Sequence, residues 1–168
     1  MPLLAVGTPT PGFNLTSSAF TNNANLPTEF SCAASNGGVS PPLAWSGAPS
    51  SARAFALVDQ DPDVAPPQGP FTHWVTYNIP ATVTSFDQAL PTTPTLPNGA
   101  MQGLNGRGQV GYLGACPPPG APAHHYTFQI FALDGTLPLQ PGASIGALRD
   151  ALNGHVVAQT QLVALFGR

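Results

Sequence analysis

The chain has 168 residues, which is the size of one ordinary domain. Only 7% of its residues are charged, its cations are four arginines, and its net charge is −3, whereas an average domain has about 25% charged residues. Binders of nucleic acid and polybasic proteins of membrane surfaces need a basic face. The charge count therefore argues against both classes of partner.

The hydrophobic residues, 42% of the chain, lie in short runs separated by 21 prolines and 18 glycines. This grouping favours a folded chain over a disordered one. No apolar stretch reaches the roughly 20 residues that a membrane-spanning helix requires. Residues 1–12 show no secretory signal and are expected to form a flexible tail before a single domain over residues 13–168. We expect a cytoplasmic protein, or an exported one whose signal has been cleaved.

Strand-like runs begin at residues 43–45 and 54–60 and continue at residues 73–79, which two prolines bound. Because side chains alternate along a strand, the third run should place four residues on one face. These residues are His73, Val75, Tyr77 and Ile79.

The second half of the chain first presents a long, turn-rich span at residues 81–122, which its length predicts to be either functional or poorly ordered. A strand is then predicted at residues 126–133, with Tyr126 and Phe128 on one face, shared by His124 if the strand begins early. Ser144 is the predicted N-cap of a helix that stops at Asn153-Gly154.

The last segment, residues 155–166, alternates apolar and polar side chains, as a closing strand does. Many strands, proline-rich corners and a single clear helix predict an all-β-dominated fold. The expected architecture is an antiparallel β-sandwich with one or two short helices near the C-terminus.

Several segments, in a consistent order from about residue 13 onward, resemble the phosphatidylethanolamine-binding protein family. The likeness is greatest to its bacterial branch, which resembles Raf kinase inhibitor protein. The matching pieces are Phe30-Ser31-Cys32, Val39 to Trp45, Phe55 to Val58, Asp61-Pro62-Asp63, His73-Trp74-Val75, Asn78-Ile79-Pro80, Gly111-Tyr112, Cys116 to Gly120, His124-His125-Tyr126 with Phe128, Ala132-Leu133-Asp134 and Gly154 to Ala158. No single piece is specific, but their ordered combination is.

The resemblance implies a β-sandwich of Greek-key type with a small pocket for anions such as phosphate, acetate or a phosphorylethanolamine head group. Members of the family are binding and regulatory proteins, some of them inhibitors of kinases or proteases, and not established catalysts. The resemblance therefore implies no enzymatic activity and no cofactor. It also implies a homodimer and a protein target that the sequence cannot name.

Carried over by position, the ligand-binding residues fall into a pocket and one wall. The pocket should contain Asp61, His73, His124 and Tyr126, and the wall should contain Cys116, Pro117 and Pro118. Imidazole, phenol and backbone N–H donors can hold an anion without any lysine or arginine. The Asp61 carboxylate would repel an anion, but it can accept from an imidazole N–H, which fixes the tautomer of the ring.

The sequence departs from the family pattern at three positions. Val64 makes the loop after Asp63 one residue longer, and Ala115 replaces a common proline. His125 stands where the family has an arginine, which should remove a permanent charge and an internal ion pair.

Other interpretations of these residues stay open. Asp59 can belong to a solvated turn, and His155 can pack at the junction between the predicted helix and the last strand, without contacting a ligand. Cys32 and Cys116 can form a disulfide in an oxidising compartment, remain two free thiols, or supply half of a metal site. In the main alternative function, Asp61, His73 and His124 form the 2-His-1-carboxylate site of a metal-dependent enzyme.

Overall fold

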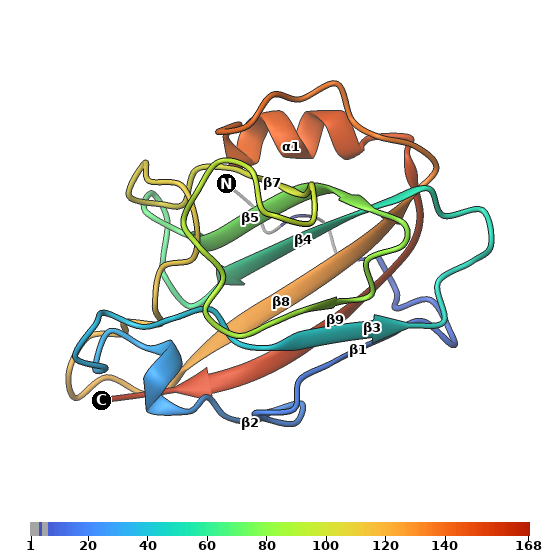
Figure 1. Ribbon diagram of the computed structural model, residues 1–168. Helices are drawn as coiled ribbons and strands as arrows, with labels where there is room; N and C mark the ends of the chain where they lie inside the picture. Colours follow the sequence, from blue (N-terminus) through green and yellow to red (C-terminus); the bar gives the residue numbers. More distant parts are fainter. Residues whose placement is uncertain (1–3, 5–6) are drawn as a thin grey trace.

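The computed structural model describes residues 4 and 7–168, so part of the predicted N-terminal tail lies outside the described residues. Most of the regular structure consists of strands (Figure 1). The strands are β1 (Asn14–Thr16), β2 (Ala24–Asn25), β3 (Leu43–Ser46), β4 (Ala54–Asp61), β5 (Phe71–Pro80), β6 (Ser85–Phe86), β7 (Met101–Gln102), β8 (His124–Leu133) and β9 (Val156–Phe166). The helices are the short 3-10 helix η1 (Thr28–Phe30) and the α-helix α1 (Ile145–Leu152).

The strands form two sheets, one of order β1-β3-β6 and one of order β2-β9-β8-β4-β5-β7. Every strand pair is antiparallel except β2–β9, where the two residues of β2 add to the edge of β9 in parallel. The predicted all-β-dominated fold with a helix near the C-terminus is therefore confirmed. The predicted antiparallel pairing holds for the other strand pairs, and the Greek-key description stays a prediction.

Both faces of the large sheet are covered, which explains why every residue of β4 is buried. On one face, Leu43 and Trp45 of the small sheet share a hydrophobic cluster with Phe55 and Phe128 of the large sheet. On the other face, Leu148 of α1 joins a second cluster (Figure 1). The sheet is thus held between the small sheet and the helix.

Local sequence signals fixed the two C-terminal elements as predicted. The Ser144 side chain accepts a hydrogen bond from the Ala147 amide at 3.1 Å, which satisfies a free N–H of the first turn of α1. The helix ends at Leu152, before the turn at Gly154. In β9, every second residue from Ala158 to Phe166 is buried, so the predicted alternation is confirmed.

The predicted alternation in β5 was wrong. Val75 and Tyr77 pack in the cluster that contains α1, whereas Ile79 packs in the cluster on the opposite face. Two irregularities of β5 cause the change. Between Trp74 and Thr72, β5 advances by two residues while its partner β4 advances by one. In addition, Asn78 has a φ of 50°. A bulge of this kind turns a side chain to the other face. The first irregularity falls at His73.

The described part of the N-terminal segment packs on the large sheet. Leu4 is buried, and its amide donates to Gln60 Oε1 at 3.2 Å. The Thr10 amide donates to the carbonyl of Gln159 at 2.8 Å. Among the described residues, no helix has the length and apolar character needed to cross a membrane.

Candidate functional site

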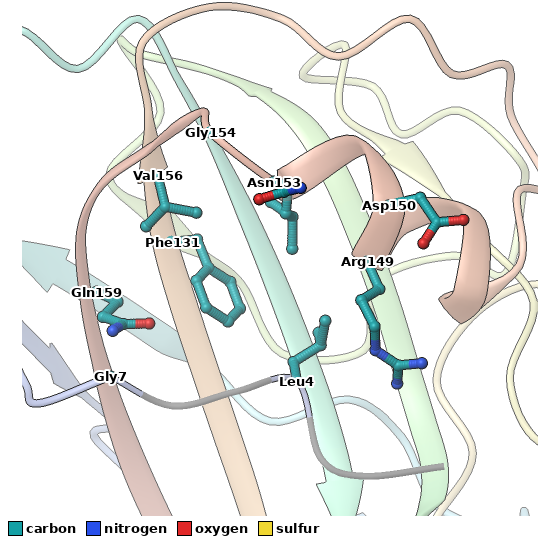
Figure 2. A pocket seen from close by; sticks show the side chains of 10 residues that line it. Leu4, Gly7, Phe131, Arg149, Asp150, Asn153, Gly154, Val156 and Gln159 are labelled. Carbon is teal, nitrogen blue, oxygen red and sulfur yellow. The ribbon is translucent and has the colours of Figure 1, made fainter.

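Two cavities at opposite ends of β8 are candidates for the functional site. The larger, of about 770 Å³, lies between α1 and β9, and Figure 2 shows Leu4, Phe131, Arg149 and Val156 among the residues that line it. The smaller, of about 460 Å³, lies where β4 ends and β8 begins. Two histidines and two aspartates line the smaller cavity, so the groups that can hold and exchange protons converge there.

Five of the seven predicted ligand-binding residues line this smaller cavity. They are Asp61, His73, Cys116, Pro118 and His124. Pro117 does not line it, and its carbonyl accepts a hydrogen bond from Arg168 Nε at 2.7 Å. Tyr126 lies beneath the cavity, fully buried, with its ring centroid 5.1 Å from that of His73.

Asp61 holds His124 in one orientation. The Nδ1–H of His124 donates to Asp61 Oδ2 at 2.7 Å, and the other carboxylate oxygen accepts from the Asp63 amide at 2.9 Å. The pair is well buried, with side-chain exposures of 14% for His124 and 3% for Asp61. Because Nδ1 is committed to Asp61, Nε2 is the ring nitrogen left for a ligand.

His73 is fixed by a reciprocal contact with Leu113. Its Nδ1–H donates to the Leu113 carbonyl at 2.8 Å, and the Leu113 amide donates to the His73 carbonyl at 2.9 Å. Burial lowers the pKa of His73, and the Arg107 charge acts in the same direction, against the backbone of Leu113 and Gly114 and the Asp61 carboxylate. The imidazole is therefore largely neutral at pH 7, and its Nε2 then offers an acceptor.

The Tyr126 hydroxyl lies near the Asp61 carboxylate and the backbone of Cys116. No atom of the described residues meets hydrogen-bond geometry with this hydroxyl. Burial, followed by the charges of Asp61 and Asp59, raises the pKa of Tyr126 far above its ordinary value. The phenol therefore stays protonated beneath the pocket.

Asp59 is not part of a solvated turn, so that interpretation was wrong. The residue lies inside β4 with no exposed surface, and neither carboxyl oxygen has a hydrogen-bond partner among the described residues. Burial, assisted by the charge of Asp61, raises the pKa of Asp59 well above its ordinary value. The sequence signal was misleading because β4 continues through the acidic residues to Asp61 before the chain turns.

Arg107 also lines the cavity, which the sequence analysis missed. Its amide donates to Asn105 Oδ1 at 3.0 Å, and the Gly106 amide donates to the Thr72 carbonyl at 2.7 Å. A Cβ at position 106 would lie 2.6 Å from the ring of Phe71, so the lack of a side chain at Gly106 lets this turn approach β5 without displacing that ring. The turn therefore brings a permanent cation to a site that was expected to need neither lysine nor arginine.

His125 retains an internal pair, although the sequence predicted its loss. Its amide and its Nδ1–H both contact Asp63 Oδ2, at 2.6 and 2.9 Å. Burial opposes the effect, but these hydrogen bonds lower the pKa of Asp63. His155 lies at the helix–strand junction as predicted, where its ring contacts Asp134 at 2.8 Å.

Cys32 and Cys116 form a disulfide, which decides among the three alternatives left open by the sequence. The backbone reinforces the link, since the Cys32 amide donates to the Ala115 carbonyl at 3.0 Å. The bond connects the segment after η1 to a loop that lines the cavity.

The predicted metal-binding triad is not assembled as one. Asp61 and His124 hold each other, while His73 donates to a backbone carbonyl. Within residues 4 and 7–168, no group of three His, Cys, Asp or Glu side chains has an arrangement suited to a metal ion. The geometry therefore gives the metal-dependent alternative no support.

The chain matches the family model described as phosphatidylethanolamine-binding protein over residues 16–167. It is 41% identical over 155 residues to a UPF0098 protein of Methanothermobacter thermautotrophicus, covering 92% of this chain and 99% of the relative. It is 36% identical over 162 residues to the UPF0098 protein YbcL of Escherichia coli, covering 92% of this chain and 87% of that protein.

Solved structures agree with the sequence matches. The crystal structure of Escherichia coli YbcL, described as a new member of the mammalian PEBP family, matches with a TM-score of 0.84 and 34% identity, over 94% of this chain and 99% of YbcL. A Chlamydia trachomatis protein described as a PEBP homologue matches with a TM-score of 0.83 and 32% identity, over 95% of this chain and 99% of its own. This chain therefore belongs to the phosphatidylethanolamine-binding protein family.

Proposed function

We propose that the chain is a non-enzymatic binding and regulatory protein whose pocket holds a small anion, such as phosphate or the head group of a phospholipid. One observation carries the proposal. Two imidazoles with their Nδ1 atoms already committed, and the guanidinium of Arg107, line the same cavity. Such a set offers fixed nitrogen atoms and a cation to one ligand.

The acidic residues fit the same proposal. Asp61 does not stand free to repel the ligand, because both of its oxygens already accept hydrogen bonds. Asp63 lies at the same cavity and is also paired, through His125. An ammonium group beside the bound anion, as in phosphorylethanolamine, would be attracted to these two carboxylates.

We expect anion affinity to fall as pH rises. An anion is held best by a protonated His73, whose pKa burial has lowered, so the ring is charged only at pH values below the ordinary 6.5 or so. Asp61 favours the charged ring and Arg107 disfavours it, and we expect a bound anion to favour it further. Calorimetric titration with sulfate, which remains a dianion throughout, should show an affinity that falls by up to about tenfold per pH unit between pH 5 and 8.

A matched variant shows whether the imidazole causes this fall. His73→Asn lacks the titrating ring and should bind sulfate weakly, with a flatter pH profile than the wild-type protein. A wild-type affinity that stays constant from pH 5 to 8 would contradict the imidazole-based site.

Regulation of a partner is the second part of the proposal. A kinase or protease inhibitor that works through this pocket should lose inhibition when an anion saturates the pocket, or in the His73→Asn variant. Inhibition assays with and without sulfate test this expectation. Light scattering coupled to size-exclusion chromatography tests the expected homodimer.

A further inference from the structure

One wall of the pocket is a loop, residues 112–118, that lies between β7 and β8. Four residues of this loop line the cavity: Leu113, Gly114, Cys116 and Pro118. Near one end of the loop, Leu113 exchanges two hydrogen bonds with His73. Near the other end, the Pro117 carbonyl accepts a hydrogen bond from Arg168. Between these two anchors, the loop is tied to residues 30–32, at the end of η1.

The tie to residues 30–32 consists of hydrogen bonds and one covalent bond. The Cys32 amide donates to the Ala115 carbonyl at 3.0 Å, and the Ala115 amide donates to the Phe30 carbonyl at 3.3 Å. The Tyr112 hydroxyl donates to the same Phe30 carbonyl at 2.7 Å. The Cys32–Cys116 disulfide is the covalent part. Because Phe30 is fully buried in the hydrophobic cluster between the two sheets, the tie joins the wall to a fixed point of the core.

The position of this wall determines the groups that a ligand meets. The Leu113 carbonyl holds the Nδ1–H of His73, and the backbone of Gly114 acts on the same ring. The backbone of Cys116 lies near the Tyr126 hydroxyl beneath the cavity. A displacement of residues 113–116 would therefore change the orientation of the His73 ring and the shape of the cavity together.

A small thiol reductant can reach the disulfide, since Cys32 and Cys116 are both partly exposed. When a dithiol reduces the bond, the S–S bond breaks and two electrons and two protons pass to the two sulfur atoms. The two cysteines become thiols, and the reductant closes a disulfide of its own. Non-bonded sulfur atoms cannot remain at bonding distance, so the wall and the segment after η1 have to move apart.

We propose that the Cys32–Cys116 disulfide is a redox switch of the anion pocket, which binds its ligand more tightly when the bond is intact than when a dithiol has reduced it. The inference rests on the proposed anion-binding function and adds the regulation of that site. With the bond intact, the wall is already ordered before the ligand arrives. After reduction, part of the wall has to be ordered during binding, which lowers the affinity.

Calorimetric titration with sulfate at pH 6 tests the switch on the oxidised protein and on protein kept reduced by dithiothreitol. Dithiothreitol is uncharged and does not compete for an anion site. The reduced protein should bind sulfate about three- to tenfold more weakly, as expected if binding has to order about one residue of the wall. Circular dichroism under the same conditions should show that both forms are folded.

The reduction potential of the disulfide gives a reciprocal measurement. If the oxidised form binds sulfate more tightly, sulfate must favour the oxidised form by the same factor. Redox buffers of dithiothreitol, with and without saturating sulfate at constant ionic strength, should therefore give a potential that sulfate makes more negative by about 14–30 mV. This shift is the same three- to tenfold factor for a two-electron couple.

Two variants separate the switch from a general loss of stability. The double variant Cys32→Ser, Cys116→Ser should bind sulfate as the reduced wild-type protein does and should not respond to dithiothreitol. Leu148→Ala is the matched control, because it removes a fully buried side chain of α1 from the other hydrophobic cluster and destabilises the protein without touching the wall. This variant should keep the wild-type sulfate affinity in both redox states.

The remaining outcomes distinguish the switch from the proposed function. Equal sulfate affinities of the oxidised and reduced protein, or a potential that sulfate does not shift, would overturn the switch and leave the anion pocket standing. Unfolding on reduction, or an equal loss of affinity in Leu148→Ala, would assign the effect to overall stability and would also overturn the switch. Failure of sulfate to bind in either redox state would overturn both.

Discussion

Reduction of the Cys32–Cys116 disulfide should lower the free energy of unfolding by about 2–4.5 kcal/mol. The bond closes a loop across a sequence separation of 84 residues, so its loss releases a large part of the unfolded chain from a constraint. The melting temperature should fall by about 5–15 °C. Urea denaturation with and without reductant measures the effect.

The control for this prediction is the double variant Cys32→Ser, Cys116→Ser. Cys32 and Cys116 are the two cysteines of the sequence, so the variant should not respond to reductant, and the reduced wild-type protein should unfold at the same urea concentration as the variant. Equal stabilities of the oxidised and reduced wild-type protein would contradict a stabilising bond.

The contribution of Asp59 to the free energy of unfolding should decrease as pH rises above about 4. Burial raises the pKa of the folded-state carboxyl well above its ordinary value, so the folded protein keeps a proton that the unfolded chain loses. The contribution of Asp59 to stability is therefore fully present below the unfolded pKa of about 3.9. It is lost at up to about 1.4 kcal/mol per pH unit until the folded-state pKa is reached.

The variants Asp59→Asn and Asp59→Val remove this titration and should share one pH profile, although their packing differs. Their free energies of unfolding should rise relative to wild type as pH increases from 4, measured by urea denaturation at each pH. A difference from wild type that stays constant with pH would show that Asp59 is ionised in the folded protein.

Local patterns were sufficient for the elements that obey a regular period. The N-cap at Ser144, the stop at Gly154 and the alternation of β9 depend on neighbours in the sequence, and they were predicted correctly. β5 was correctly predicted as a strand, but the predicted distribution of its side chains between the two faces was wrong. The extra residue at His73 and the positive φ of Asn78 depend on pairing with β4, which no local pattern reveals.

The pocket shows the same division between local and tertiary information. Asp61, His73 and His124 were singled out through ordered family motifs, and the structure brings them to one cavity. Arg107 was missed because it is exposed in a turn-rich loop and reaches the cavity through the turn at Asn105. Asp59 was misinterpreted because its burial depends on β5 and β8, the two strands that flank β4 in the sheet.

The central claim is that the imidazoles of His73 and His124 hold an anion. NMR of the ring nitrogens during titration with methyl phosphate tests this claim most directly. We expect saturable shifts of Nε2 in both rings, while both Nδ1 atoms remain protonated in their contacts with Leu113 and Asp61. His155, which contacts Asp134 at the helix–strand junction, serves as the internal reference and should not respond. Shifts absent from His73 and His124, or equal to those of His155, would contradict the claim.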